Sequence, residues 1–450
     1  MMSSDHSARA RWAIRVAASR HVPVYRSSYA LILTTGLNAV MGVLFWVAAA
    51  RLYPTDVVGL GAGGISALQL VATIGWVGLI FTIMRYVPVA GTARRRLVLG
   101  VYATGVGMAV AAAALFTATL TGRLNVGFVT DGRASTFAFC AAAAVWVVFT
   151  LQDGALISLR RAPWVPVENL LYGTLKLILL VALSAVATPW TLLGAWVGAA
   201  AIVALIVNAF LFGRLLGATT DAPGLPSARG IARFSAGHTG AAFIAFVPDF
   251  LVPLLILAYL DAGANAYYYA AWSVGLSIRA LAVNIADALI VEAAYGQETF
   301  ARLLRMVGRL FAVLLGPLIL VMLVGAAPIL RIFGAAYDDE ATALLRYFAL
   351  SLVPFTIVTL ALALDRVRER FADALLITSV GTMTAVGLDI ILIPRHGITG
   401  AGVGWLVGQS LAALVAIRTL RKELPDARLR GRGNRPRDPQ LARSPVRMSR

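Results

Sequence analysis

The stretch TLLGAWVGAAAIVALIVNAFLF, residues 191–212, contains no charged side chain and is long enough to cross a membrane as a helix. Comparable stretches recur along the whole 450-residue chain, which is 60% hydrophobic and 13% charged, with a mean hydropathy of +0.82. A soluble domain has about 25% charged residues. The composition therefore excludes a soluble enzyme and a nucleic-acid-binding domain, and the single cysteine excludes a disulfide scaffold. We predict an all-α polytopic membrane protein.

Twelve stretches of about 20 or more mostly apolar residues predict twelve transmembrane helices. Segments of about ten residues with alternating hydrophobicity, which would indicate a membrane β-barrel, are absent from the sequence. The expected helices are residues 29–50, 57–83, 97–120, 136–159, 165–187, 191–212, 236–259, 266–291, 306–326, 341–364, 371–393 and 398–417.

The loops between these helices have similar lengths in the two halves of the chain, which predicts two lobes of six helices each. A six-plus-six arrangement with a binding site between the halves is a common plan for transporters. We expect a basic arm (1–28), a first lobe (29–212), a linker (213–235), a second lobe (236–418) and a basic disordered tail (419–450).

The basic residues also predict the orientation of the chain. With a cytoplasmic N-terminus, 31 of the 39 Arg and Lys residues lie on the inner side and six lie in outer loops. Cytoplasmic segments of membrane proteins carry an excess of basic residues. Both termini are therefore expected in the cytoplasm, and most of the net charge of +18 reflects orientation rather than an anionic partner.

Two basic residues, Lys176 and Arg279, lie within the expected helices. A charge near the bilayer centre costs at least about 2.5 kcal/mol, so each such residue suggests a function. Lys176 follows Glu168 and Tyr172 at a spacing of four residues, which places the three side chains on one helix face. Lys176 either faces a cavity and meets an anionic substrate, or forms a buried structural pair, for instance with Glu168.

Asp249 lies at a depth similar to that of Arg279 in the neighbouring helix, so the two can form an ion pair. The ion pair either has a purely structural role or takes part in transport. In the second case Arg279 faces the cavity, and Asp249 binds a proton or cation whose occupancy changes the ion pair. Pro248 and Pro253 flank Asp249 and should kink its helix. Asp389 is a further candidate for a cation site shared with Asp249. An asparagine at a position such as Asn38 more often forms an interhelical hydrogen bond. We still include Asn38, together with Tyr172, among the candidate substrate-binding residues.

The chain lacks motifs of common catalytic or nucleotide-binding sites. It has no P-loop, no HExxH sequence and no paired histidines. The acidic cluster Asp338, Asp339 and Glu340 is expected to be a solvated outer loop rather than a metal site. The glycine run beginning at Gly59 lies in an apolar helix and predicts close helix packing rather than a phosphate cradle. We therefore expect no enzyme activity and no cofactor.

Five segments together resemble polysaccharide-biosynthesis flippases of the MOP (multidrug/oligosaccharidyl-lipid/polysaccharide) superfamily, in particular the actinobacterial type. The segments are NAVMGVLFWVAAARLYPTDVVGLG (38–61), RRAPWVPVENLLYGTLKLILLV (160–181), ANAYYYAAWSVGLSIRALAVNIADALIVEAA (264–294), PILRIFGAAYDDEATALLRYFALSLVP (328–354) and LIPRHGITGAGVGWLVGQS (392–410).

The resemblance implies the MATE/MOP fold, with two six-helix lobes around a positively charged cavity and alternating access. It implies a bacterial cytoplasmic-membrane protein that translocates a polyprenyl-phosphate-linked saccharide, with membrane lipids, glycosyltransferases or a polymerase as candidate partners. In the related lipid II flippases a sodium site joins an Asp of helix 7 to helices 11 and 12, and Asp249 and Asp389 match those helices. Coupling to H⁺ or Na⁺ is left open.

The function expected from the sequence is thus translocation of a lipid-linked saccharide. Lys176 and Arg279 would neutralise its phosphates, since two cations against one carboxylate favour an anion. The alternatives are a drug/cation antiporter of the same fold and, from a different class, a glycan-processing membrane enzyme. The short outer loops argue against the enzyme.

Overall fold

The computed structural model describes residues 36–217, 227–295, 300–367 and 370–433, and these are almost entirely helical. The expected N-terminal arm and the end of the tail lie outside the described residues. The first described helix is Gly36–Leu52. The helices that follow are α2 (Thr55–Trp76), α3 (Leu79–Tyr86), α4 (Arg94–Thr119), α5 (Arg133–Ser158), α6 (Trp164–Ala182), α7 (Pro189–Phe210), α8 (Ala228–Tyr259), α9 (Ala262–Tyr295), α10 (Phe300–Val324), α11 (Ala326–Arg331), α12 (Ala335–Val367), α13 (Phe371–His396) and α14 (Ile398–Gly433).

The all-α polytopic membrane class is confirmed. Among the described residues, ten helices are long and apolar enough to cross a membrane. Three shorter apolar helices accompany them: Gly36–Leu52, Leu79–Val89 and Phe311–Val324. The ten spans match ten of the twelve expected helices. The other two expected helices, 29–50 and 306–326, correspond to the shorter segments Gly36–Leu52 and Phe311–Val324.

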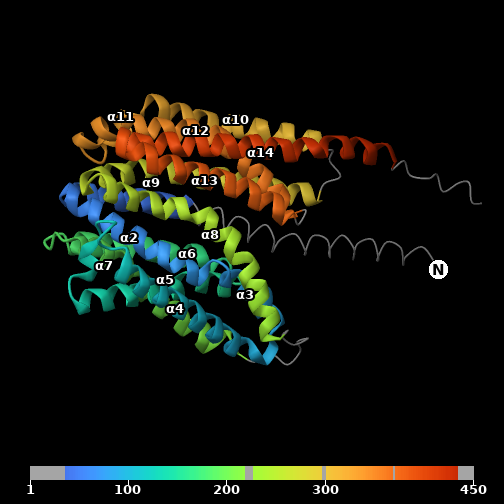
Figure 1. The fold of residues 1–450 in the computed structure, drawn as a ribbon. Helices are drawn as coiled ribbons and strands as arrows, with labels where there is room; N and C mark the ends of the chain where they lie inside the picture. The colour runs from blue at the N-terminus through green and yellow to red at the C-terminus, as the bar shows by residue number, and fades with distance from the viewer. Residues whose placement is uncertain (1–35, 218–226, 296–299, 368–369, 434–450) are drawn as a thin grey trace, which may run out of the picture.

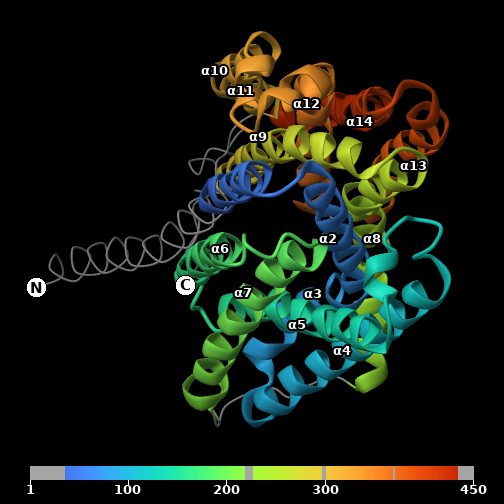
Figure 2. The same ribbon diagram turned by 90° about the vertical axis from the view of Figure 1, so that its left-hand side faces the viewer.

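The helices gather in two groups, which we call the N-lobe (the helices up to α7) and the C-lobe (α8–α14). Figure 1 shows α4–α7 on one side of the molecule and α10–α14 on the other. Figure 2 shows α2 at the centre, where it packs against α8 and α9 as well as against α4, α5 and α7. The central position of α2 explains why most of its side chains are buried.

The glycine run of α2 forms the seam between the lobes, as close helix packing requires. A Cβ atom at Gly59 would lie 1.6 Å from the carbonyl oxygen of Ala262, so α9 can approach only a glycine here. The amide of Asn265 donates a hydrogen bond to the Gly59 carbonyl at 2.8 Å. At the end of the first described helix, the guanidinium of Arg51 donates to the carbonyls of Arg331 and Ile332 at the end of α11. The lobes are therefore joined along α2 and at the end of the first described helix.

Three boundaries differ from the expectations. The expected helix 57–83 is divided into α2 and α3, and at Gly78, between them, α8 approaches so closely that a Cβ atom would collide with Thr239. The linker is shorter than expected, since α8 already begins at Ala228, where the Ser227 hydroxyl accepts a hydrogen bond from the Gly230 amide and caps the helix. At the C-terminus, α14 continues to Gly433, so residues 419–433 of the expected disordered tail are helical.

The acidic cluster before the expected helix 341–364 is also not a solvated loop. α12 begins at Ala335, and Asp338 lies buried in its first turn. The Asp338 carboxylate accepts hydrogen bonds at 2.7 Å from the Arg331 guanidinium. An acidic side chain in a first helical turn is favoured by the helix dipole. Asp338 therefore fixes the end of α11 to the start of α12, while Asp339 and Glu340 are exposed.

Candidate functional site

A cavity of about 500 Å³ lies between the lobes and brings together four of the predicted site residues. Asn38, Tyr172 and Lys176 line it from the N-lobe, and Asp249 lines it from the C-lobe. Its surface is rich in aromatic rings: Trp46, Trp146, Phe149, Trp196, Phe246, Phe250, Tyr269 and Trp272. A second cavity of about 220 Å³ continues into the C-lobe, where Arg279 lines it, and Asp249 belongs to both.

Lys176 is almost completely buried, with 4% of its surface exposed. Its ammonium lies over the ring of Trp196 at 4.3 Å, with the rings of Tyr172 and Phe45 at 5.0 and 5.2 Å from Nζ. The expected alternative of a pair with Glu168 is not formed, because the spacing of eight positions separates the two residues by about 12 Å along α6. Within the part of the chain that the structure describes, Nζ makes no ion pair or hydrogen bond. Aromatic faces stabilise a cation without neutralising it.

Arg279 differs from Lys176 because its charge is compensated. Its two terminal nitrogens donate to the two carboxylate oxygens of Asp249, both at 3.2 Å. Such a bidentate pair fixes the geometry of both groups. The guanidinium also lies within about 5 Å of the rings of Trp272 and Trp405. Its Nε is buried without a hydrogen-bond partner.

Asn38 and Asp389 have structural contacts. The amide of Asn38 donates to the Asn169 side chain at 3.1 Å and so ties the first helix to α6. Asp389 is 1% exposed and lines neither cavity that contains Asp249. It packs against Gly404, where a Cβ would lie 2.0 Å from its carboxylate oxygen. The close packing of α13 on α14 thus places Asp389 against α14, where its Oδ1 is buried without a hydrogen-bond partner. Asp249 and Asp389 both lie near the buried side chain of Tyr268, so a shared cation site stays a prediction.

The structure adds an acidic residue that the sequence analysis does not single out. Asp153 of α5 lines the central cavity, next to Glu168 of α6. The sequence does contain a signal for Asp153, because it is an ionisable residue inside the apolar stretch 136–159. The aromatic lining, in contrast, carries no sequence signal, because tryptophans in membrane helices are also common at membrane interfaces. With Asp153 included, the charges around the cavities are mixed rather than predominantly basic.

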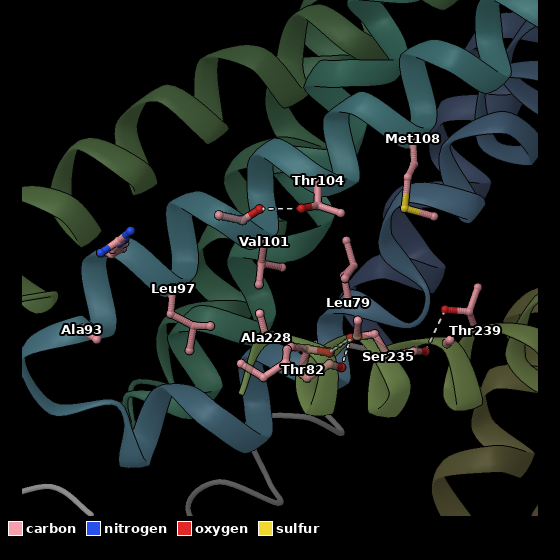
Figure 3. Close-up of a pocket in the computed structure, with 15 residues that line it drawn as sticks. Leu79, Thr82, Ala93, Leu97, Val101, Thr104, Met108, Ala228, Ser235 and Thr239 are labelled. Carbon is pink, nitrogen blue, oxygen red and sulfur yellow. Dashed lines mark hydrogen bonds between the residues drawn. The ribbon is translucent and has the colours of Figure 1, made fainter. Parts of the chain in front are cut away.

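A third cavity, of about 830 Å³, lies between α3, α4 and α8 and has a mostly apolar lining (Figure 3). Leu79, Leu97, Val101 and Met108 contribute side chains to it, and hydroxyl groups of Thr82 and Ser235 hydrogen-bond to each other at 2.6 Å across it. None of the predicted site residues lines this groove. Arg96 is the charged residue among the side chains that line it.

Comparison with known proteins shows similarity at the level of structure alone. No protein-family model and no curated protein sequence matches the chain. An inward-facing multidrug resistance MATE transporter of the MOP superfamily superposes with a TM-score of 0.65 and 17% identity, over 90% of this chain and 99% of that one. The lipid II flippase MurJ in an inward closed conformation gives a TM-score of 0.70 and 11% identity, over 90% of each chain. The chain has the fold of MOP-superfamily transporters.

A third structure with the MOP fold is informative because of its binding pocket. It is a MOP-superfamily transporter from Pyrococcus furiosus, described as having a pocket of reversed polarity that suggests a different function. It gives a TM-score of 0.57 and 15% identity, over 90% of this chain and 96% of that one. Structures with the MOP fold therefore include pockets of different polarity, and the substrate of this chain must be argued from its own cavity.

Proposed function

We propose that the chain translocates a polyprenyl-phosphate-linked saccharide across the bacterial cytoplasmic membrane by alternating access of the central cavity. The two lobes would rock about the seam formed by α2, α8 and α9, with both termini in the cytoplasm. Glycosyltransferases and a polymerase acting on the same carrier lipid are the partners that this role requires. The step breaks no covalent bond, so it needs binding groups rather than a catalytic residue.

The observation that carries the proposal is the uncompensated ammonium of Lys176 in the central cavity. A buried charge without a counter-ion is costly, and an anionic ligand would remove that cost. Two further hydrogen-bond donors lie beside it without a partner, the indole Nε1 of Trp196 and the hydroxyl of Tyr172. A phosphate offers several acceptor oxygens, so this group of three donors matches a phosphate better than a neutral ligand.

Arg279 would act at a second stage, because Asp249 occupies it in this state. A phosphate that enters the C-lobe cavity competes with Asp249 for the two terminal nitrogens of the guanidinium. The exchange would free Asp249 and change the contacts of α8. The aromatic rings of Trp146 and Trp272 in the central cavity offer flat apolar surfaces to a sugar ring.

The proposal is tested by flipping of a fluorescent polyprenyl-pyrophosphate-linked sugar in proteoliposomes, together with binding of the carrier lipid in detergent. Lys176→Ala and Arg279→Ala should abolish flipping at normal protein levels. Lys176→Met should weaken binding by tenfold or more, because a charge-assisted hydrogen bond contributes about 1.5–3 kcal/mol. Arg346→Met, at an exposed position on α12, is the matched control and should flip normally. Flipping retained in both alanine variants would refute the assignment.

A second candidate, a drug/cation antiporter, is favoured by the carboxyl groups of Asp153 and Asp249 among aromatic rings in the cavity. Aromatic faces and carboxylates bind lipophilic cations. The same binding assay with tetraphenylphosphonium distinguishes the two. An antiporter should bind this cation, and Lys176→Met should bind it more tightly because a repelling charge has been removed. A saccharide flippase should bind the pyrophosphate lipid and not the cation.

A further inference from the structure

The structure places two carboxyl groups side by side in the N-lobe, Asp153 near the end of α5 and Glu168 in the second turn of α6. The two groups interact with each other, and Asp153 also interacts with the side-chain amide of Asn169. Asp153 reaches the surface of the central cavity, whereas Glu168 lies behind it with 4% of its surface exposed. The pair therefore has one buried member and one member with access to the cavity.

The pair has few groups around it that could compensate negative charge. Both carboxylate oxygens of Glu168 and one oxygen of Asp153 are buried without a hydrogen bond of good geometry. On α4, the buried hydroxyl of Tyr102 faces both carboxyl groups and also lacks a partner. On the first helix, Asn38 reaches only Asn169. Lys176 is two turns further along α6, and no Arg or Lys in the described part of the chain forms an ion pair with either group.

Two ionised carboxylates cannot lie in contact in such surroundings. Burial in an apolar medium and repulsion between like charges both act against the doubly ionised state. Paired carboxyl groups in other proteins resolve this conflict by sharing one proton. We propose that Asp153 and Glu168 bind one proton between them, exchange it with the central cavity through Asp153, and form the coupling site of the transporter.

The C-lobe offers a weaker candidate for this role. Asp249, the residue first expected to bind a coupling ion, already has Arg279 as its counter-ion. Asp389 is also buried with an unpartnered carboxylate oxygen, but it packs against α14 and lines neither cavity that contains Asp249, so it lacks access to them. The carboxyl pair of the N-lobe combines burial, missing partners and access to the cavity.

The position of the pair relates it to the anion-binding group, and this part of the inference rests on the proposed function. Glu168, Tyr172 and Lys176 lie on one face of α6, so the pair and the ammonium are about 12 Å apart. Loss of the shared proton adds a negative charge beside the place where the phosphate would bind. Proton binding and binding of an anionic headgroup should therefore favour each other.

The proton is detected directly by infrared difference spectroscopy of the purified protein in lipid. Because the buried carboxyl of Asp389 also has an unpartnered oxygen, the measurements use Asp389→Asn as the common background. In sodium-free buffer at neutral pH, this protein, otherwise wild type, should show the C=O stretch of one buried protonated carboxyl. In Glu168→Gln and in Asp153→Asn the remaining carboxyl has no charged neighbour, so it should release its proton more readily. As the pH is raised, its band should therefore disappear at a proton concentration at least about tenfold higher than in the protein with both carboxyl groups. Glu340→Gln, the same substitution at an exposed position, should leave the band unchanged.

Three results would overturn the inference. The first is a wild-type spectrum without a protonated carboxyl band at neutral pH. The second is a band that both variants retain with the wild-type pH dependence, since it would then belong to another residue. The third is removal of the band by added Na⁺, which would make the pair a sodium site. Using two variants guards against loss of folding in one of them, which size-exclusion chromatography would reveal.

The spectroscopic test does not depend on the substrate, so its outcome separates the two proposals. A band with the expected behaviour, in a protein that binds tetraphenylphosphonium instead of the pyrophosphate lipid, would retain the proton site and reject the saccharide. The opposite result is a protein that shows no band and flips the lipid-linked sugar independently of a pH gradient. It would support the saccharide as substrate and refute the proton site.

Discussion

At the scale of single residues, the two cations of the membrane interior differ in the way their charge is stabilised. Lys176 rests on three aromatic rings and has no counter-ion among the residues that the structure describes, whereas Arg279 is held by Asp249. The charge of Lys176 is therefore available to a ligand in this state, and that of Arg279 becomes available only when Asp249 leaves. The sequence does not distinguish the two residues in this respect, because both are single basic residues within apolar stretches.

The pair Asp249–Arg279 gives a prediction at this scale. Both side chains are largely buried, with 12% and 15% exposed, so removal of one partner leaves an uncompensated charge. Asp249→Ala or Arg279→Ala alone should lower the free energy of unfolding by about 2–4 kcal/mol. The double variant should lose less than the sum of the two, because no isolated charge remains. Thermal or denaturant unfolding in detergent measures this, and additive losses would show that the pair has no coupling.

At the scale of elements, α8 remains one helix through Pro248 and Pro253. Figure 1 shows it running from beside α3 to beside α9. A proline at position 248 cannot donate the hydrogen bond that the carbonyl of Ile244 would normally accept. The Thr382 hydroxyl of α13 donates to that carbonyl at 3.2 Å instead. The proline thus allows a contact between α8 and α13, in which Thr382 binds the backbone of α8.

This contact predicts a dependence between two positions. Thr382→Val keeps the shape of the side chain and should lower the free energy of unfolding by about 0.6–1.5 kcal/mol, because the Ile244 carbonyl loses its donor. In a Pro248→Ala background the backbone amide of residue 248 supplies the missing hydrogen bond, and Thr382→Val should then cost little. Thr382→Ser retains the hydroxyl and is the control. An equal cost of Thr382→Val in both backgrounds would contradict this explanation.

At the scale of the whole molecule, the seam between the lobes is made by backbone contacts of small residues. Gly59 touches Ala262, and the Ser66 and Tyr269 hydroxyls hydrogen-bond between α2 and α9. These contacts and those of Arg51 lie toward the end of the molecule that the positive-inside rule places outside. The lobes are joined at this end in the present conformation. The orientation of the molecule therefore determines on which side of the membrane the space between the lobes is closed.

The orientation is predicted to place both termini in the cytoplasm. Cys140 is the only cysteine, so Cys140→Ser provides a background for labelling single introduced thiols. In intact cells, Gly122→Cys, in the exposed loop after α4, should react with a membrane-impermeant maleimide. Gly217→Cys, after α7, should react only when the membrane is permeabilised. The reverse pattern would invert the proposed direction of transport.

The membrane class and most spans of this protein are determined by its sequence, because long apolar segments with few charges can satisfy their backbone only as helices in lipid. Spacing also indicated that Asp249 and Arg279 lie at matching depths. The close approach of α8 at Gly78 and the Arg331–Asp338 pair at the start of α12 could not be predicted, since both join segments that are far apart in the sequence or separated by a turn. Only the tertiary structure decided that Lys176 has no counter-ion among the described residues, that Asp389 packs against α14, and that Asp153 meets Glu168. Each of these depends on which helix faces another, and hydrophobic spacing within one helix carries no information on its neighbours.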